Sequence, residues 1–316
     1  MMRLGAVLER LEPSRVFTVV DRHVRDLHGL PFEGPWAAAE PGEHHKTLAS
    51  WQQLIDRFVD EHLDRDAVIL AVGGGATLDL AGFAAAAYLR GVRWVGVPTT
   101  LLAMVDAAWG GKTGVDLPAA KNLVGAFHNP SEVVIAPEFL STLPERELRG
   151  GLAEVVKHGV IRDPSLLDRA GRDDPATFVD DAALVKRAIV EGDPLDRGER
   201  RTLNLGHTIG HAIERASEYQ LHHGEAVAIG LRAACCIAER HCGFVQREMV
   251  EESLDRCGLP ASARLDERAV LEALAHDKKR SSRSFRWVLP VSIGDVRVFD
   301  DVPAEHVQAA LAEVLA

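Results

Sequence analysis

The sequence predicts two domains: an α/β domain with a Rossmann-like parallel sheet over residues 1–150 and a mainly α-helical domain over residues 151–316. Length is the first observation, because 316 residues suffice for two domains of about 100–200 residues each. The second is that short strand-like runs alternate with helical patterns in the first half, as in parallel α/β sheets. The third is that helical patterns dominate after about Gly150.

The first half contains four candidate strands. Residues 15–20 form a strand-like run that ends at Asp21, and residues 67–72 form a continuous apolar run typical of a strand buried on both faces. Residues 94–97 and 133–135 are further candidates. A helix is expected over residues 78–89, directly after three glycines.

The second half consists mainly of helical patterns. They cover residues 151–163, 164–172, 176–192, 202–218, 223–241, 244–257 and 266–276. Two weaker strand candidates follow at residues 286–291 and 296–299.

Composition excludes several classes of protein. Hydrophobic residues make up 47% and charged residues 26%, which excludes a disordered chain, a collagen-like chain and a disulfide-stapled miniprotein. The formal net charge of −11 makes the chain a poor candidate for sequence-independent nucleic-acid binding, which needs a broad basic face. A small anionic substrate remains compatible with this charge, since a pocket can hold local positive charge.

The cysteines and the apolar regions predict a reduced cytoplasmic protein. No cysteine pair has CxxC spacing, which favours buried thiols over a thiolate metal site for Cys235, Cys236, Cys242 and Cys257. Charged residues interrupt both apolar regions that could act as a signal peptide or a membrane span: Glu9, Arg10 and Glu12 in the first, and Asp79, Arg90 and Arg93 in the second.

Three consecutive glycines, Gly73-Gly74-Gly75, lie between a predicted strand and a predicted helix. Glycines there permit a tight turn and let backbone N–H groups approach a phosphate at the helix N-terminus, as in dinucleotide sites. The run is not GxGxxG, so a plain tight turn is an equally open interpretation. Asp79, expected in the first helical turn, would cap the helix or bind a ribose.

A group of side chains in the second half has the composition of a metal site. His207 and His211 are four residues apart, so on a helix they share one face. His223 follows twelve residues later, and Glu154 lies in an earlier helical segment. One carboxylate and two imidazoles leave coordination positions open, as in catalytic zinc sites. A chance pairing is the alternative, and one of the paired histidines can carry protons while the other is a ligand.

Cationic residues suggest an anionic substrate. Lys112 lies in the glycine-rich stretch 110–114, which is not a P-loop because Asp106 occupies the position of its first glycine. Further cations follow at Lys121, Lys157, Lys186, Arg200, Lys278 and Lys279. For each lysine the alternative is an ordinary solvated surface charge.

Together these segments resemble the 3-dehydroquinate synthase family of sugar phosphate cyclases. The resemblance extends from about Val16 to Val291. Its clearest blocks are residues 73–75 with 79–83, 97–102, 105–106, 110–115, 121–127, 151–157, 203–211 and 223–228.

The resemblance implies NAD⁺, a divalent metal (zinc or cobalt) and a homodimer. It implies a carbon–oxygen lyase that converts 3-deoxy-D-arabino-heptulosonate 7-phosphate to 3-dehydroquinate and phosphate, a reaction of the shikimate pathway of aromatic amino acid biosynthesis. The metal would polarise the hydroxyl that is oxidised, and NAD⁺ would take up and return the hydride within one turnover.

Site residues are implied by the same resemblance. Glu154, His207 and His223 match the metal ligands. The positions that match NAD contacts are Asp21, Glu43, Lys46, Gly73, Gly74, Gly75, Asp79, Thr99, Thr100, Lys121, Phe139, Leu140, Ser141 and Thr142. The positions that match substrate-binding or proton-handling residues are Asp106, Lys112, Asn122, Lys157, Lys186, Arg200, Asn204 and His211, with one of Lys278 and Lys279. Arg90 matches an arginine that reaches the substrate phosphate of the neighbouring subunit.

Some positions depart from the family pattern. Trp109 precedes Gly-Gly-Lys where a small or β-branched residue is usual, Asp116 replaces an asparagine, and Asp196 replaces a glutamate. The opening strand and hairpin of the family are expected to be missing, and residues 27–41 look abbreviated. These departures leave open an aminodehydroquinate synthase or another sugar phosphate cyclase of secondary metabolism. A metal- and NAD-dependent polyol dehydrogenase and a non-catalytic binding relative are the remaining alternatives.

Overall fold

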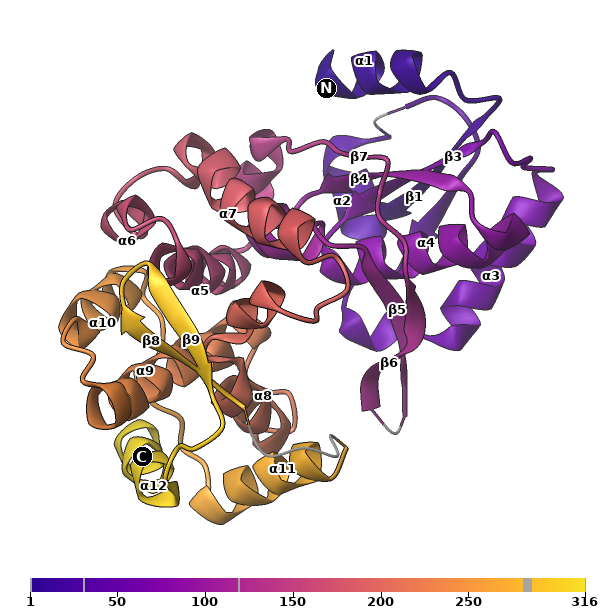
Figure 1. Cartoon of the computed structure of the whole chain (residues 1–316). Coiled ribbons are helices and arrows are strands. Elements are labelled where there is room, and N and C mark those ends of the chain that lie inside the picture. The colour runs from indigo at the N-terminus through magenta and orange to yellow at the C-terminus, as the bar shows by residue number, and fades with distance from the viewer. Residues whose placement is uncertain (1, 31, 119, 281–285, 316) are drawn as a thin grey trace. The chain divides into compact units, whose positions relative to one another are not determined.

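The computed structural model describes residues 2–30, 32–118, 120–280 and 286–315, and the side chains of these residues except Met2 and 276–280. The chain divides into two compact units, Met1–Leu143 and Pro144–Ala316, which Figure 1 shows in indigo to magenta and in magenta to yellow. The predicted division at 150/151 lies a few residues further along the chain. Among the described residues, no helix combines the length and the apolar character that a membrane span requires.

A five-stranded parallel sheet forms the centre of the first unit, as the sequence predicts. Its strands lie in the order β2-β1-β3-β4-β7. Their bounds are β1 Val16–Asp21, β2 Trp36–Ala39, β3 Val68–Gly73, β4 Arg93–Pro98 and β7 Glu132–Val133. Strand β3 is buried along its whole length, which explains its continuous apolar run. Strand β7 is shorter than the predicted run and begins one residue earlier.

Four helices accompany this sheet: α1 Met2–Leu11, α2 Arg22–His28, α3 Leu48–Asp60 and α4 Gly75–Ala87. Helix α4 packs against β3 and α3 (Figure 1). Phe58 of α3 is buried edge-on against Phe17 of β1, with ring centroids 5.1 Å apart. Only α4 was predicted, and it begins three residues earlier than expected because the chain turns into the helix at Gly74.

An antiparallel hairpin, β5 Lys112–Leu117 and β6 Ala120–Phe127, follows β4 and a π-helical turn at Ala103–Ala107. The glycine-rich sequence of this stretch does not predict strands. The hairpin packs on α4 and so brings Asp116 and Asn122 to the side of the sheet that carries Lys46.

The second unit is mainly helical, which confirms the predicted fold class. Its helices are α5 Glu145–Ile161, α6 Ser165–Arg169, α7 Val179–Gly192, α8 His207–Ala216, α9 His223–Cys242, α10 Arg247–Arg256, α11 Glu267–Arg280 and α12 Ala304–Val314. The predicted hairpin is present as β8 Trp287–Ser292 and β9 Asp295–Phe299. Two expected helices begin as separate 3₁₀ turns, Pro175–Thr177 and Glu199–Asn204. The second turn is separated from α8 by Gly206, whose φ of +77° breaks the helix.

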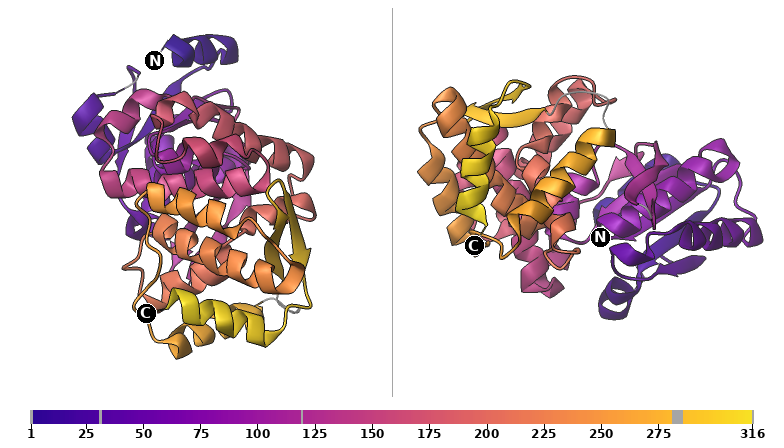
Figure 2. Two further views of the ribbon diagram at one scale, coloured as in Figure 1. Left: turned by 90° about the vertical axis from the view of Figure 1, so that its left-hand side faces the viewer. Right: turned by 90° about the horizontal axis from the view of Figure 1, so that it is seen from below.

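Helix α9 lies at the centre of the second unit, where it packs against α5, α8 and α12 (Figures 1 and 2). Its close approach to two neighbours depends on glycine. A Cβ atom on Gly224 would lie 2.2 Å from the carbonyl oxygen of Gly150, and one on Gly230 would lie 2.0 Å from that of Gly206. These contacts bring α5 and the start of α8 against α9, and with them Glu154 and His207 against His223.

The cysteines are free thiols, as expected, with Cys235, Cys236 and Cys257 buried. Burial raises the pKa of Cys235 and that of Cys257 to about 12, so neither forms a thiolate at neutral pH. No cysteine belongs to the clusters of metal-binding side chains found among the described residues.

Candidate active site

Three side chains from different helices of the second unit form a compact group of metal-binding atoms. Glu154 lies inside α5, while His207 and His223 are the first residues of α8 and α9. Oε1 of Glu154 lies 3.6 Å from Nε2 of His207 and 3.7 Å from Nε2 of His223. One donor atom from each residue lies within 4.8 Å of the other two.

The donor set fits a zinc-like ion. Zinc–nitrogen and zinc–oxygen bonds of about 2.0–2.1 Å in tetrahedral geometry separate two ligand atoms by about 3.4 Å. The two observed separations, 3.6 and 3.7 Å, are slightly wider than this. Glu154 is fully buried, and a carboxylate in such a place requires a cation. The buried ammonium of Lys157, one turn along α5, pairs with Glu154 on one side.

The two ligand histidines have different surroundings. Burial and the charge of Lys157 lower the pKa of His207 well below its usual value. Burial also acts to lower the pKa of His223, but the carboxylates of Glu154 and Glu214 outweigh it and raise the pKa to about 10. His207 is therefore neutral and ready to bind a metal, whereas a metal at His223 must displace a proton.

His211 lies one turn after His207 on the same face of α8, as the i,i+4 spacing predicts. Its ring centroid is 5.1 Å from that of His207 and 6.0 Å from that of His223. His211 is exposed, whereas Glu154 is buried. It is not part of the group formed by Glu154, His207 and His223, so a proton-carrying role suits it better than a place in that ligand set.

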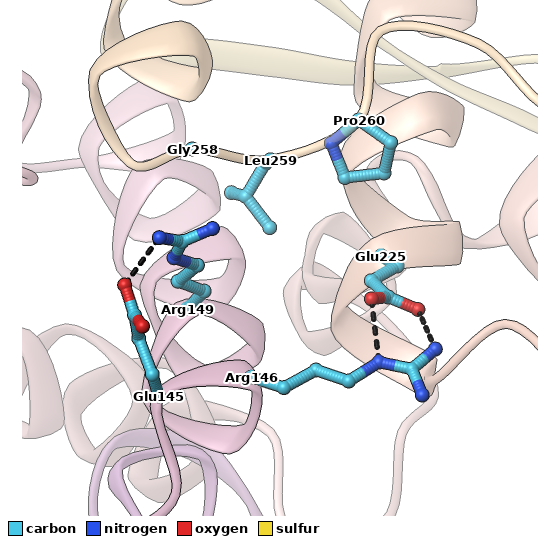
Figure 3. Close-up of a pocket in the computed structure, with 7 residues that line it drawn as sticks. All are labelled: Glu145, Arg146, Arg149, Glu225, Gly258, Leu259 and Pro260. Carbon is cyan, nitrogen blue, oxygen red and sulfur yellow. Dashed lines mark hydrogen bonds and ion pairs between the residues drawn. The ribbon is translucent and has the colours of Figure 1, made fainter.

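The start of α9, which carries His223, is anchored to α5. Figure 3 shows the guanidinium group of Arg146 reaching across from α5 to the carboxylate of Glu225, with N–O distances of 2.8 and 2.6 Å. Glu225 also accepts a hydrogen bond from the backbone N–H of His222 and so closes a capping box at the start of α9. This pair was not predicted. Its signal in the sequence is a glutamate three residues after the N-cap residue His222.

The other predicted site residues of the second unit differ in their exposure to solvent. Lys186 of α7 and Arg200 of the turn Glu199–Asn204 are both buried. Arg200 donates a hydrogen bond to the carbonyl of Pro194 (2.8 Å), and Asn204 is exposed. The side chains of Lys278 and Lys279 lie outside the described residues.

Several of the residues predicted to contact NAD⁺ lie where the parallel strands end. Asp21 ends β1, Gly73 ends β3, and Thr99 and Thr100 follow β4. The N–H of Thr99 donates to the carbonyl of Gly73 (3.0 Å), so β3 and β4 end together. Helix α4 begins directly after Gly74, and no side chain caps it. Its free N–H groups at the carboxyl edge of the sheet form the place where α/β proteins hold a pyrophosphate.

Lys46 joins three segments of the first unit. Its ammonium group is buried and lies 2.7 Å from Glu43, 3.0 Å from Asp79 and 2.7 Å from Oδ1 of Asn122. Burial lowers the pKa of Lys46, but the carboxylates of Asp79, Glu43 and Asp116 outweigh it and raise the pKa. Burial raises the pKa of Asp79 to about 6, against the opposing effect of Lys46.

Asp79 does not cap α4, which corrects one of the two roles expected for it. It is the fifth residue of the helix rather than part of the first turn, because α4 begins at Gly75. Its carboxylate pairs with Lys46 instead.

Asn122 has a left-handed backbone, with φ of +55°. Asp116 stabilises this conformation by accepting a hydrogen bond from the N–H of Asn122 (2.7 Å), while Lys46 binds the Asn122 side chain. The aspartate that replaces the usual asparagine at position 116 is thus part of the Lys46 network. Lys112, on the same hairpin, is exposed, and Lys121 is half-buried.

Other predicted residues of the first unit lie outside this network. Phe139 is buried edge-on against His28, with ring centroids 4.9 Å apart. Leu140 is half-buried, and Ser141 and Thr142 of the same turn are exposed. Arg90 is exposed, with a left-handed φ of +65°. Asp106 lies in the turn Ala103–Ala107. Trp109 packs against the core, and its indole N–H donates to the carbonyl of Met104 (2.8 Å).

The fold of this chain is shared with the sugar phosphate cyclases. Two solved structures of this class share the fold. One is the 2-epi-5-epi-valiolone synthase ValA from Streptomyces hygroscopicus subsp. jinggangensis 5008, with NAD⁺ and Zn²⁺ bound. It is 28% identical, with a TM-score of 0.87 over 95% of this chain and 90% of that one. The other is a 2-deoxy-scyllo-inosose synthase complexed with carbaglucose-6-phosphate, NAD⁺ and Co²⁺, 26% identical with a TM-score of 0.85 over 99% and 94%.

The chain belongs to the 3-dehydroquinate synthase family. The family model for the N-terminal part of 3-dehydroquinate synthase matches residues 36–150, and that for the C-terminal part matches residues 151–280. A 3-dehydroquinate synthase from Symbiobacterium thermophilum is 43% identical over 98% of this chain and 94% of its own length.

Proposed function

We propose that this chain is a 3-dehydroquinate synthase, which converts 3-deoxy-D-arabino-heptulosonate 7-phosphate to 3-dehydroquinate and phosphate. Family membership supports this activity over nearly the whole chain. The single observation that carries it is the convergence of Glu154, His207 and His223 from three helices onto a space that fits a zinc-like ion.

The reaction needs two groups that the chain would hold. Glu154, His207 and His223 would hold Zn²⁺ or Co²⁺, which supplies a Lewis acid for the hydroxyl that is oxidised. Asp21, the glycine turn at Gly73–Gly75 and Asp79 would hold NAD⁺, which supplies a reversible hydride acceptor. Both groups are present in the two related structures described above.

The chain's own residues bind the substrate and handle protons. Arg200 and Lys186 are buried cations, and we assign them to the substrate carboxylate because buried arginine suits a bidentate carboxylate. His211, exposed beside the two ligand histidines, carries a proton near the phosphate. Lys157 holds the charge of Glu154 in place, and Lys112, Asn122, Asp106 and Asn204 complete the substrate contacts.

Retention of Arg200 and Asn204 favours a substrate that bears a carboxylate over a neutral sugar phosphate. An aminodehydroquinate synthase would share this requirement, so it remains the second candidate. Trp109 does not distinguish the two, since its indole ring packs against the core of the first unit.

Three further properties belong to the same proposal. We infer that zinc is the metal, that the enzyme works in the cytoplasm and that it is a homodimer in which Arg90 reaches the partner's substrate phosphate. The four free thiols support a reducing compartment. The exposed, left-handed Arg90 in the 3₁₀ turn Tyr88–Arg90 after α4 supports an outward-reaching role.

The activity is tested by supplying the heptulosonate phosphate and NAD⁺ to zinc-loaded protein. We expect one phosphate and one 3-dehydroquinate per substrate, with no net NADH, because the hydride returns within the turnover. Phosphate release only from the amino analogue would indicate the second candidate. Net NADH from glycerol would indicate a polyol dehydrogenase instead, and a folded protein that does not bind NAD⁺ in calorimetry would indicate a non-catalytic relative.

NAD⁺ affinity is expected to fall as the pH is lowered from 8 to 5. The pKa of Asp79 is raised to about 6, so at pH 5 most of the carboxyl is protonated. The protonated form loses its ion pair with Lys46 and accepts ribose hydroxyls poorly. The dissociation constant should rise by at most about tenfold at pH 5, since one proton is involved.

The matched variants for this pH dependence are Asp79→Asn and Asp56→Asn, the latter on the exposed face of α3. Calorimetric titration with NAD⁺ at each pH should give a nearly flat profile for Asp79→Asn and the wild-type profile for Asp56→Asn. A wild-type profile in Asp79→Asn would show that another group is responsible.

A further inference from the structure

Glu214 is a carboxylate close to the metal-binding group that none of the roles assigned above uses. It lies on α8 seven residues after His207, hence on the same face of the helix. The residue is 8% exposed. A buried carboxylate on this face faces the start of α9, where His223 lies.

The contact between Glu214 and His223 determines which ring nitrogen keeps its proton when the other binds a metal. Oε2 of Glu214 lies 3.3 Å from Nδ1 of His223. An ionised carboxylate only accepts hydrogen bonds, so Nδ1 keeps its proton and donates, and Nε2 is the nitrogen that gives up its proton to a metal. Nε2 is the atom that lies 3.7 Å from Oε1 of Glu154. Nε2 therefore faces the space that the three ligands share.

His207 has a different partner behind it. Its Nδ1 donates to the carbonyl oxygen of Leu205 at 3.1 Å, which likewise leaves Nε2 for the metal. One ligand imidazole is thus supported by a neutral peptide group and the other by a carboxylate. A carboxylate behind a ligand histidine orients the ring and increases its donor strength more than a carbonyl does.

We propose that Glu214 is a positioning residue of the metal site, which holds His223 in its metal-binding tautomer and strengthens it as a ligand. This inference rests on the proposed metal site and adds a fourth residue to it. Glu214 acts through His223 and does not itself bind the ion.

A second cation is the competing interpretation of the same residues. His211, Glu214 and His223 also have donor atoms within 4.8 Å of one another. A metal there would have to replace the Nδ1 proton of His223, which would then bridge two ions as an imidazolate. The hydrogen bond to Glu214 favours a single ion, bound on the Nε2 side.

The test is zinc affinity, measured by competition with a chelator in the absence of substrate. Glu214→Gln keeps the shape of the side chain and removes its charge. We expect its zinc dissociation constant to rise by about 10- to 100-fold. In Co²⁺-loaded protein the visible bands should shift, because the donor strength of His223 changes. Glu214→Asp should recover part of the affinity.

Glu313→Gln is the matched control. Glu313 lies on α12 of the same unit and pairs with Arg247, so its loss removes a charge and an ion pair away from the histidines. Wild-type zinc affinity in Glu214→Gln, or an equal loss in Glu313→Gln, would overturn the proposal. Two zinc ions per wild-type chain would overturn it in favour of a second cation.

The test of Glu214 can succeed or fail independently of the test of the proposed function. Zinc binding that depends on Glu214, in a protein that releases no phosphate from the heptulosonate phosphate, would support the positioning role and reject the activity. Phosphate release with a zinc affinity independent of Glu214 would support the activity and reject the positioning role.

Discussion

Glu154→Ala is expected to lose zinc and to lower turnover by more than about 100-fold. Glu154 is the only carboxylate in the group of three donors that fits the ion, and even a change behind a metal ligand typically lowers affinity or activity 10- to 100-fold. Zinc content per chain and phosphate release measure the two effects. NAD⁺ binding should persist, because its residues belong to the first unit.

The control for Glu154→Ala separates the loss of zinc from the loss of the ion pair with Lys157. Its buried ammonium pairs with Glu154, and removing one partner of a buried pair typically costs about 3–5 kcal/mol. Glu154→Gln combined with Lys157→Met removes both charges and should fold better than Glu154→Ala while still lacking zinc. A wild-type zinc content in either protein would show that Glu154 is not a ligand.

Gly224→Ala is expected to destabilise the second unit by about 2–3 kcal/mol and to weaken zinc binding. The added Cβ would lie 2.2 Å from the carbonyl oxygen of Gly150 and 2.3 Å from its Cα. Both atoms belong to the backbone of α5, so α5 and α9 must move apart. That movement separates Glu154 from His223, which lie four residues after Gly150 and one before Gly224.

Gly150→Ala is the control on the opposite side of the same contact. Its Cβ would lie 3.8 Å from the Cα of Gly224, an ordinary contact distance. Since alanine favours a helix over glycine by about 1 kcal/mol, this variant should be as stable as the wild type or more so. Urea unfolding followed by circular dichroism compares the two. Equal destabilisation by both substitutions would show that the helices do not meet as described.

Much of the fold is visible in local patterns. The apolar run 67–72 and the helical periodicity of the second half are patterns of residues that are close together in the chain. Strands and helices could therefore be predicted from them. The i,i+4 spacing of His207 and His211 likewise determines a shared helix face. The sequence patterns did not reveal helices α1, α2, α3 and α12, strand β2 or the β5–β6 hairpin, and two predicted helices begin as separate 3₁₀ turns. The hairpin residues form strands by pairing with one another, and that pairing leaves little trace in a glycine-rich sequence.

The candidate site was recognised through a family resemblance. The i,i+4 spacing alone did not show which of His207 and His211 is a metal ligand. The structure distinguishes the two members of that pair: His207 joins the group with Glu154 and His223, and His211 lies outside it. It also assigns Asp79 to Lys46 rather than to the start of α4.

Local patterns of residues are enough to predict the class of each half of the chain and the residue types available for chemistry. Which of those residues meet depends on how the folded chain packs. Lys46 reaches Asp79 and Asn122 across 33 and 76 positions of the chain, and Glu214 reaches His223 between two helices. Such contacts depend on how closely whole helices and strands pack, as at Gly224 and Gly150, and no local pattern of residues encodes that distance.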